Sequence, residues 1–335
     1  MKRFFATLLC LVLSFTTALA VGCGGSEGAV SVKYYEKAEY MISALKQGQI
    51  NVGILPEPAA TQLVSTSTDK TWYRLDVQEL YDSQTKSYPQ AVMMVKQGLL
   101  NACPELVSAI SSAFSSNLEW VKSNPALAVQ TINEKISGFT PSLKAPSITS
   151  EVVDRCKIYW QNASDSKAQV QNYLADIMAI EPQSAKAVAD DFFYTGESSG
   201  SFIKTSVSVA VPDGAPALSI AKFIYDNETF GTGKTFEYKV VASGNIATEM
   251  QLGDSDIIVM PVNAASNLYN KFYADPYKLV SVVTHGNLYI MSSEKIDSIS
   301  DLKGKTVGSI GLGLVPDLTF RSILSKNNIE YQVAI

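Results

Sequence analysis

The chain has 335 residues, of which 46% are hydrophobic and 18% are charged, and its formal net charge is −5. This length and composition are sufficient for a full hydrophobic core and predict a folded protein of two domains. Because the acidic balance leaves no basic stripe that would neutralise phosphates, we expect no nucleic-acid partner.

The first 22 residues predict a targeting signal rather than part of the fold. Lys2 and Arg3 precede the apolar run Phe4–Leu19, and small residues lie directly before Cys23. A basic start followed by an apolar segment is typical of an export signal, and small residues before a cysteine resemble a bacterial lipoprotein signal. We therefore expect residues 1–22 to be a signal peptide, Cys23 to carry a lipid, and residues 23–29 to form a flexible tether. The alternatives are an ordinary secretory signal or a short membrane anchor.

The first half of the mature chain begins with an α/β segment and continues as mostly helical sequence. The pattern predicts a helix over Tyr35–Gln47, a strand over Ile50–Leu55, and a strand over Tyr88–Val95 that crosses between lobes. Apolar residues at helical spacing, with proline in several first turns, predict helices at Pro104–Lys122, Pro125–Ile132, Ile148–Trp160, Ser166–Ile180 and Pro182–Phe193.

The second half alternates short strands and helices. Its strands are rich in valine and isoleucine and carry few charges, which favours strands covered on both faces. The predicted strands are Ser206–Val211, Glu237–Ala242, Asp256–Met260, Tyr277–Val283, Asn287–Ser292, Lys305–Ile310 and Glu330–Ala334. The predicted helices between them are Ala217–Asn227, Asn245–Leu252, Ala264–Tyr269 and Asp317–Lys326.

Two segments of the chain match each other at a constant offset, which indicates an internal repeat. The matched segments are Leu45–Leu63 and Met250–Leu268, in which Gly48 corresponds to Gly253 and Pro56 corresponds to Pro261. A second match pairs the strand at Glu330–Ala334 with the strand at Glu237–Ala242. The repeat predicts two similar α/β lobes that face each other across a ligand cleft.

One of the two predicted units is split between the ends of the chain. The unit that starts at Lys305–Ile310 stops after Glu330–Ala334, and its missing helix and strand are found at Tyr35–Gln47 and Ile50–Leu55. We interpret this order as a circular permutation, which proteins tolerate when the original termini lie close together. A truncated or mis-joined chain is the alternative.

The predicted fold class is therefore α/β, with two lobes, each a mostly parallel sheet flanked by helices. The division that we expect has seven parts: a signal peptide (1–22), a tether (23–29), the second part of lobe 2 (30–87), a hinge strand with a helical segment that packs mainly on lobe 1 (88–195), a linker (196–204), lobe 1 (205–292) and the first part of lobe 2 (293–335).

Small-residue loops follow several of the predicted strands and open helices. Ligands of open α/β sheets bind beyond the carboxyl ends of the strands, and free N–H groups at helix starts favour an anionic group. Neutral asparagines in such loops would orient a small polar ligand. The predicted ligand-binding residues are Asp213, Gly214, Ala215, Asn245, Asn263, His285, Asn287, Gly311, Leu312, Gly313, Glu57 and Pro58. Each loop, taken alone, also fits an ordinary turn between strand and helix, and Asp317 fits a helix cap.

The sequence predicts neither catalytic residues nor a metal or other cofactor. His285 is the single histidine, so no histidine cluster or Ser-His-Asp site is expected. Besides Cys10 in the leader and Cys23, which is expected to bear the lipid, the chain has Cys103 and Cys156, which have no metal-ligand spacing, and the sequence leaves open whether they pair.

Four stretches resemble the substrate-binding lipoproteins of bacterial ABC importers, and the nitrate, sulfonate, taurine and thiamine-precursor type is the most similar. These stretches are Val209–Ala221, Ile258–Ala265, Asp301–Gly308 and Leu55–Ala60. The order departs from the family pattern, since Leu55–Ala60 precedes Asp301–Gly308 here.

The resemblance implies a two-lobe periplasmic-binding-protein-like fold (type II) with two hinge crossings and a cleft that closes on a small polar or anionic organic solute. It also implies delivery of that solute to a membrane permease, a monomeric receptor, and a lipid anchor at Cys23 on the outer face of the bacterial cytoplasmic membrane. A ligand sensor and a cofactor-precursor enzyme on the same fold are the alternatives.

Overall fold

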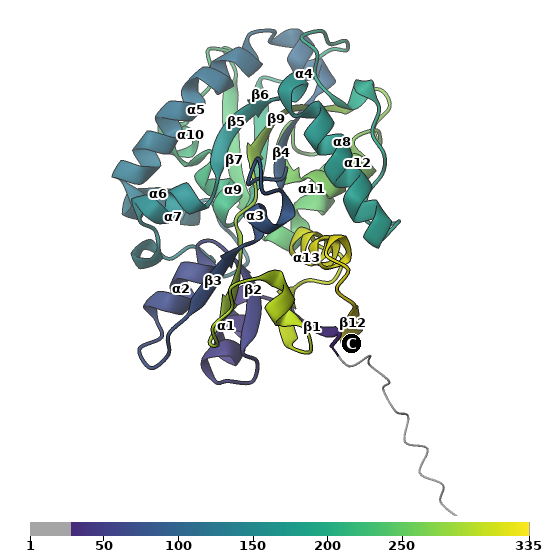
Figure 1. The fold of residues 1–335 in the computed structure, drawn as a ribbon. Helices are drawn as coiled ribbons and strands as arrows, with labels where there is room; N and C mark the ends of the chain where they lie inside the picture. The colour runs from purple at the N-terminus through teal and green to yellow at the C-terminus, as the bar shows by residue number, and fades with distance from the viewer. Residues whose placement is uncertain (1–27, 335) are drawn as a thin grey trace, which may run out of the picture.

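The computed structural model describes residues 28–334 and shows two α/β lobes, each built on a six-stranded sheet (Figure 1). The predicted α/β class with two lobes is therefore confirmed. The predicted signal peptide and Cys23 lie outside the described residues. Within the part of the chain that is described, no helix is both long and apolar enough to cross a bilayer.

Lobe 2 is the sheet that both ends of the described chain share. Its strand order is β12-β1-β11-β2-β10-β3. The strands are β1 (Val30–Tyr35), β2 (Val52–Pro56), β3 (Tyr73–Asp76), β10 (Leu288–Ser292), β11 (Thr306–Ile310) and β12 (Tyr331–Ala334). The strand predicted near Ile50–Leu55 therefore pairs in parallel with β11, through Val52 opposite Val307.

Lobe 1 is built from the middle of the chain. Its strand order is β5-β9-β4-β8-β6-β7. The strands are β4 (Ala91–Lys96), β5 (Ile158–Asn162), β6 (Ser206–Pro212), β7 (Thr235–Val241), β8 (Ile257–Pro261) and β9 (Tyr277–Thr284).

Most strands of each sheet run in the same direction, as expected, although each sheet also contains antiparallel pairs. Strand β4 runs antiparallel to β8 and β9, and β10 runs antiparallel to β2 and β3. The physical reason is that each of these strands enters from the other lobe, between two strands that run in the opposite direction. The parallel pairs lie on one side of each inserted strand, among β12, β1, β11 and β2 in lobe 2 and among β8, β6 and β7 in lobe 1.

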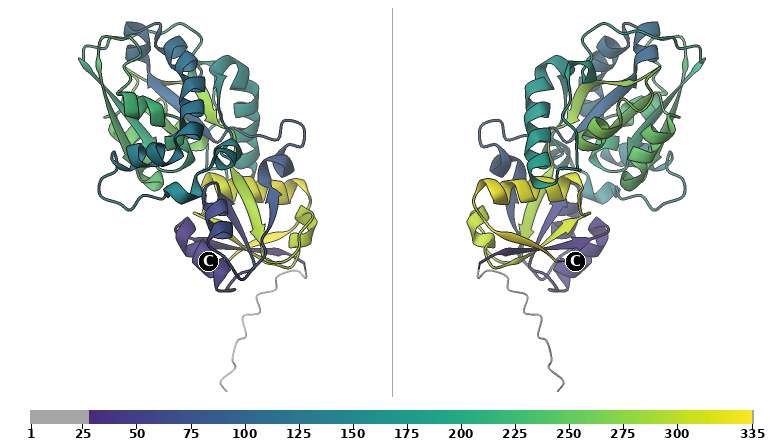
Figure 2. Two further views of the ribbon diagram at one scale, coloured as in Figure 1. Left: turned by 90° about the vertical axis from the view of Figure 1, so that its left-hand side faces the viewer. Right: turned by 90° about the vertical axis from the view of Figure 1, so that its right-hand side faces the viewer.

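Two connections join the lobes, one from β3 to β4 and one from β9 to β10 (Figure 2). They run side by side, because the Tyr88 and Gln90 N–H groups of the first donate to the His285 and Thr284 carbonyls of the second. The expected crossing near Tyr88–Val95 is therefore present. Strand β10 belongs to lobe 2, so lobe 1 ends near residue 285 and not at 292, where the sequence division placed its end.

The helices cover both faces of each sheet. Those of lobe 2 are α1 (Ala38–Lys46), α2 (Ala59–Ser65), α3 (Val77–Tyr81), η4 (Ile299–Leu302) and α13 (Val315–Lys326). Those of lobe 1 are α4 (Gln97–Ala102), α5 (Leu106–Ser123), α6 (Pro125–Asn133), η1 (Ala145–Ser147), α7 (Ser150–Arg155), α8 (Ala163–Ile180), η2 (Asp190–Phe192), α9 (Ala215–Leu218), α10 (Ala221–Asp226), η3 (Ser243–Asn245), α11 (Ile246–Leu252) and α12 (Val262–Leu268).

One hydrophobic core runs from lobe to lobe, and each sheet has a further core on its other face. The shared core includes α8 of lobe 1 and α13 of lobe 2, which pack together (Figure 1). Within it, the Tyr173 and Thr319 hydroxyl oxygens are hydrogen-bonded at 2.8 Å.

Several predicted elements differ from the observed ones. Strand β1 was not predicted, and the helix that follows it begins at Ala38 rather than Tyr35. The predicted helix Ile148–Trp160 divides into α7 and β5, because the chain turns through Lys157, whose φ is 51°. Only the short η2 is helical within Pro182–Phe193. The predicted helix Ala217–Asn227 is broken at Ile220, where φ is −131°.

Candidate functional site

The carboxyl ends of the parallel strands in both lobes point toward the crossovers. Pro56, the last residue of β2, lies opposite Leu288, the first residue of β10. In lobe 1, Pro261 at the end of β8 lies opposite Ala91 at the start of β4. Strands β1 and β11 run parallel to β2, and β6 runs parallel to β8. The loops after these strands are therefore in the region between the lobes, where ligands of such sheets bind.

The loop after β6 holds Asp213, Gly214 and Ala215. Asp213 is buried, and its Oδ2 accepts a hydrogen bond from the Ser142 N–H at 2.6 Å. Its Oδ1 has no partner among the described residues. Burial raises the pKa of this carboxyl, and the charge of Glu39 on α1 of the other lobe acts in the same direction.

The two asparagines predicted after β7 and β8 are in different surroundings. Asn245 is exposed in η3. Asn263 is buried in α12, and its amide donates to the Ser184 carbonyl at 3.2 Å. Asn263 thus holds the segment after α8 against lobe 1, a contact that sequence reasoning did not foresee.

The short crossover between β9 and β10 contains His285, Gly286 and Asn287. The His285 ring is buried and stacks on the Tyr159 ring with centroids 3.4 Å apart. Its Nε2 lies 3.2 Å from the Tyr159 carbonyl oxygen, and burial lowers its pKa to about 3. A neutral, enclosed imidazole of this kind fits a structural part of the hinge.

Gly286 is required at this crossover. Its φ is +83°, and a Cβ there would lie 2.5 Å from Cγ of Gln78 and 2.7 Å from the Tyr88 ring. Beside it, the Asn287 amide donates to the Glu57 carbonyl at 3.0 Å, and the Glu57 N–H donates to the Asn287 carbonyl at 2.8 Å. The crossover and the loop after β2 are therefore fixed to each other.

The loop Gly311–Gly313 after β11 lies before α13. The Leu312 side chain is exposed, and the Gly313 N–H donates to Oδ2 of Asp317 at 2.8 Å. Asp317 itself is buried in the first turn of α13 and also binds Arg321 and the Tyr34 hydroxyl. Asp317 therefore holds this loop through the Gly313 N–H and is itself fixed by a buried ion pair with Arg321. The sequence suggested only a helix cap.

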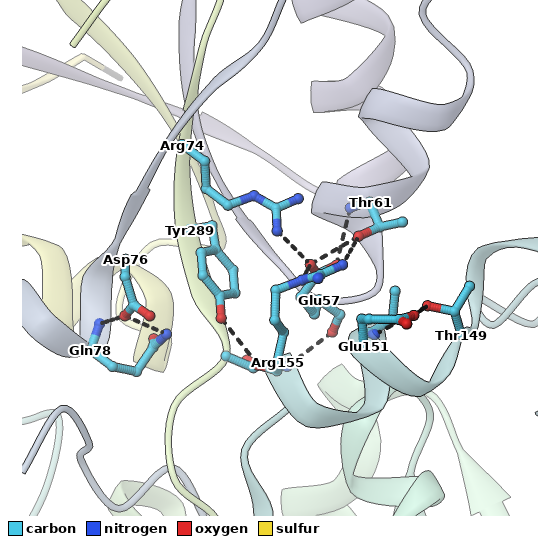
Figure 3. Close-up of polar contacts among 11 residues, drawn as sticks. Glu57, Thr61, Arg74, Asp76, Gln78, Thr149, Glu151, Arg155 and Tyr289 are labelled. Carbon is cyan, nitrogen blue, oxygen red and sulfur yellow. Dashed lines mark hydrogen bonds and ion pairs between the residues drawn. The ribbon is translucent and has the colours of Figure 1, made fainter. Parts of the chain in front are cut away.

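Glu57 lies at the centre of a polar cluster between the lobes (Figure 3). Its side chain is fully buried, and Oε1 accepts from Nη1 of Arg74 at 3.1 Å, from Nε of Arg155 at 2.7 Å and from the Thr61 hydroxyl at 2.9 Å. Oε2 accepts from the Thr61 N–H at 3.0 Å. The adjacent Pro58 precedes α2 across a cis Glu57–Pro58 bond.

The two arginines of this cluster come from different lobes. Arg74 lies on β3 of lobe 2, where its guanidinium covers the Tyr289 ring at 5.0 Å. Arg155 ends α7 of lobe 1, and its carbonyl accepts a hydrogen bond from the Tyr289 hydroxyl at 3.3 Å. Both arginine side chains are partly exposed, at 27% and 32%. The cluster therefore links the lobes and presents positive charge between them.

Sequence reasoning found Glu57 but missed Arg74, Arg155 and Tyr289. The one signal available in the sequence was the scarcity of arginine, since the chain contains only four. In the structure, two of these four meet at the Glu57 carboxylate. Among the described residues, no group of three or more His, Cys, Asp or Glu side chains could hold a metal ion, and Cys103 and Cys156 are free thiols.

Comparisons with known proteins leave the family of the chain open. No protein-family model matches the sequence, and no curated protein matches it. Among solved structures, similarity is found to an oligopeptide-binding protein of Bacillus subtilis in complex with a nonapeptide, with 9% identity, a TM-score of 0.31, and coverage of 79% of this chain and 56% of the other.

Two further solved structures are similar to this chain. One is NikA of Brucella suis in complex with Fe(III)-EDTA, with 10% identity, a TM-score of 0.30, and coverage of 84% of this chain and 59% of the other. The other is a binding protein of Agrobacterium tumefaciens in complex with agropinic acid, with 11% identity, a TM-score of 0.33, and coverage of 87% and 58%. The present chain thus spans little more than half the length of these structures, and at such low TM-scores the likeness carries no argument about its ligand.

Proposed function

We propose that the protein is an extracytoplasmic solute-binding protein that delivers a small polar or anionic organic solute to an ABC-type import permease. The observation that carries the proposal is the pair of adjacent crossovers that join two lobes whose strand ends face each other. The sequence resemblance to substrate-binding lipoproteins supports the same function.

The mechanism that we propose is hinge closure. A solute shifts the equilibrium between open and closed forms only if its contacts differ between them. Residues of both lobes in the region between the strand ends meet this condition, because a solute that touches both lobes gains contacts as they approach. In this mechanism the ligand-binding loops are those of Asp213, Asn245, Glu57 and Gly311–Gly313.

The remaining predictions about processing are part of the same proposal. The signal peptide, the lipid on Cys23, the location outside the cytoplasmic membrane, the monomeric state and the division into lobe segments with a linker at residues 196–204 are proposed on the sequence. No catalytic residue is proposed, since His285 is enclosed and its Nε2 already faces a backbone carbonyl.

We also propose that the element order is a circular permutation. Its support is the match between lobe 2, in the order β11, β1, β2, β3, and lobe 1, in the order β6, β7, β8, β9. Because β1 and β12 are parallel neighbours, with Val30 beside Tyr331, the join needs a crossover of roughly a dozen residues. We expect a chain closed by such a linker and opened at residues 196–204 to fold, and a chain closed by a direct peptide bond to melt at a lower temperature.

The proposed function is tested by thermal unfolding of residues 24–335 with sulfonates, nitrate, bicarbonate, amino acids and pyrimidines. A solute present at about 100 times its dissociation constant adds roughly 2.7 kcal/mol to the free energy of unfolding. A shift that is confined to one chemical class supports the receptor. A cooperative transition that no solute of a wide panel moves would contradict it.

A further inference from the structure

The guanidinium groups of Arg74 and Arg155 retain hydrogen-bond donors that the fold does not use. Nε and Nη2 of Arg74 and Nη1 of Arg155 donate to no described residue, although both side chains are partly exposed. A guanidinium carries five N–H donors in a rigid fork that matches a carboxylate or sulfonate. Both forks approach the Glu57 carboxylate (Figure 3), and the unused donors beside it would receive a planar or tetrahedral oxyanion.

The cluster also carries an excess of positive charge, which favours an anion. Two guanidinium cations share one buried carboxylate, that of Glu57, which is saturated by its four hydrogen bonds. Nearby, the carboxylate of Glu151 is exposed and hydrogen-bonded to the Thr149 hydroxyl, and Asp76 caps α3. One cation at the core of the cluster therefore has no buried counter-charge, and an anion that contacts both arginines would supply it.

Glu57, Thr61 and Tyr289 prepare the two arginines for this role. Glu57 and the Thr61 hydroxyl fix Arg155, and Glu57 and the Tyr289 ring fix Arg74. Side chains that are already ordered lose less conformational freedom when a ligand binds. Because one arginine belongs to each lobe, an anion held by both is bound more tightly when the lobes are together, which is the differential contact that closure requires.

From these contacts we infer that Arg74 and Arg155 form an anion subsite that binds the carboxylate or sulfonate head group of an organic solute. This inference rests on the proposed function and names the chemical class of the solute. Glu57 acts as a positioning residue for the two arginines and does not contact the solute.

The test uses the purified protein and the side-chain Nε–H nuclear magnetic resonances of its few arginines. Acetate and methanesulfonate are titrated at constant ionic strength, with neutral acetamide and dimethyl sulfone as shape-matched controls. We expect saturable shifts of the Arg74 and Arg155 signals with the two anions only. Arg321, which is buried against Asp317, is the internal control and should not move. Equal shifts with the neutral compounds would overturn the inference.

Variants separate the subsite from general surface charge. Arg74→Gln should weaken anion binding, read from the Arg155 signal, by about tenfold to a hundredfold, as loss of a charge-assisted hydrogen bond implies. Lys295→Gln changes the net charge equally at an exposed site and should leave binding unchanged. Equal anion affinity in the two variants would overturn the inference. Since Arg74→Gln leaves the Arg155–Glu57 pair in place, cooperative melting confirms its fold.

Failure of this inference differs from failure of the proposed function. A neutral solute that stabilises the protein without moving either arginine signal would overturn the anion subsite and leave the receptor standing. Anions that move both signals, together with a solute panel that never shifts the melting temperature, would support the subsite and contradict the receptor.

Discussion

The two lobes contain the same four-strand arrangement around an inserted strand, but they assemble it from the chain differently. In lobe 1, β6, β7, β8 and β9 follow one another, and β4 enters between β8 and β9. In lobe 2, the corresponding strands are β11, β1, β2 and β3, with β10 inserted between β2 and β3. Strand β11 comes from the C-terminal part of the chain, whereas β1, β2 and β3 come from its N-terminal part.

The lobes also differ at their edges. Lobe 1 has the additional strand β5 beside β9, whereas lobe 2 has the additional strand β12 beside β1. The place that β7 takes in lobe 1 is therefore taken by β1, and not by β12 as the similarity of Glu330–Ala334 to Glu237–Ala242 suggested. The two lobes share one strand arrangement, although the chain connects the strands in a different order in each. The packing of the strands, more than the order of their connections, therefore defines the region between the lobes.

The largest difference between the lobes in the free energy of unfolding is expected for ion pairs in α13 of lobe 2 and α10 of lobe 1. Asp317 and Arg321 form a buried ion pair in α13, whereas Lys222 and Asp226 form a partly exposed pair in α10. Asp317→Asn should lower the free energy of unfolding by roughly 3–5 kcal/mol, because it removes the buried carboxylate that pairs with Arg321 and leaves only the more distant Glu181, at 3.9 Å. Lys222→Ala should cost less than about 1 kcal/mol. Urea titrations measure both values, and similar losses would contradict this difference between the lobes.

The next effect concerns two glycines that correspond in the repeat. Gly48 and Gly253 both have left-handed backbones, with φ of +70° and +73°. A Cβ on Gly253 would lie 2.6 Å from the Phe272 ring, while a Cβ on Gly48 would meet only Lys70 Nζ at 3.6 Å.

Gly48→Ala should therefore cost about 1–2 kcal/mol of unfolding free energy, from backbone strain alone. Gly253→Ala should cost about 1–3 kcal/mol more, because overpacking is added. Chemical denaturation of both variants measures these two losses of unfolding free energy. A larger loss for Gly48→Ala than for Gly253→Ala would contradict the prediction.

A smaller effect distinguishes β1 from β12. Val32 on β1 is fully buried, whereas Val333 on the edge strand β12 is only half-buried. Val32→Ala removes two buried carbon groups and should cost about 1.6 kcal/mol, at roughly 0.8 kcal/mol for each. Val333→Ala should cost less than half of this. Thermal unfolding under identical conditions measures the difference, and equal costs would contradict the position of β12, rather than β1, at the edge of the sheet.

The smallest effect is a pH dependence at the shared crossover. The pKa of His285 is lowered to about 3 in the folded protein from an ordinary value of 6.5. Below pH 6.5 the unfolded chain binds a proton that the folded protein excludes, so stability falls as the pH drops from 6.5 toward 3. Between pH 6.5 and 5.5 the expected loss from this group is about 1 kcal/mol. His285→Gln should have a flatter stability profile over this range than the unchanged protein. Parallel profiles would show that the imidazole is not the cause.

The sequence predicted the parts of the fold that depend on local pattern. The constant offset that matched Pro56 to Pro261 holds in the structure, since these residues end β2 and β8, and Val52 and Ile257 begin them. Apolar strands between small-residue turns are recognised because burial on both faces demands such residues. The repeat was therefore sufficient to locate one such strand in each lobe.

The parts that the sequence did not predict depend on contacts between distant residues. Glu57 and Arg155 are separated by 98 positions, and their pairing follows only from the packing of the lobes. Arg155 was placed inside a long helix, because its apolar neighbours suit a helix as well as the end of α7 and a following strand. Strand β1 was missed although Val30 and Val32 alternate with less buried residues, because it lies directly after the tether.

The most direct test of hinge closure is the distance between the lobes with and without solute. Spin labels at Asn270 in lobe 1 and Asp297 in lobe 2, both exposed, report this distance in a Cys103→Ser background in which Cys156 remains buried. Hinge closure predicts that a solute which raises the melting temperature also narrows or shifts the distance distribution, and that Arg74→Gln weakens the response to an anionic solute. A solute that binds tightly while the distribution stays unchanged would contradict closure of two lobes around a ligand.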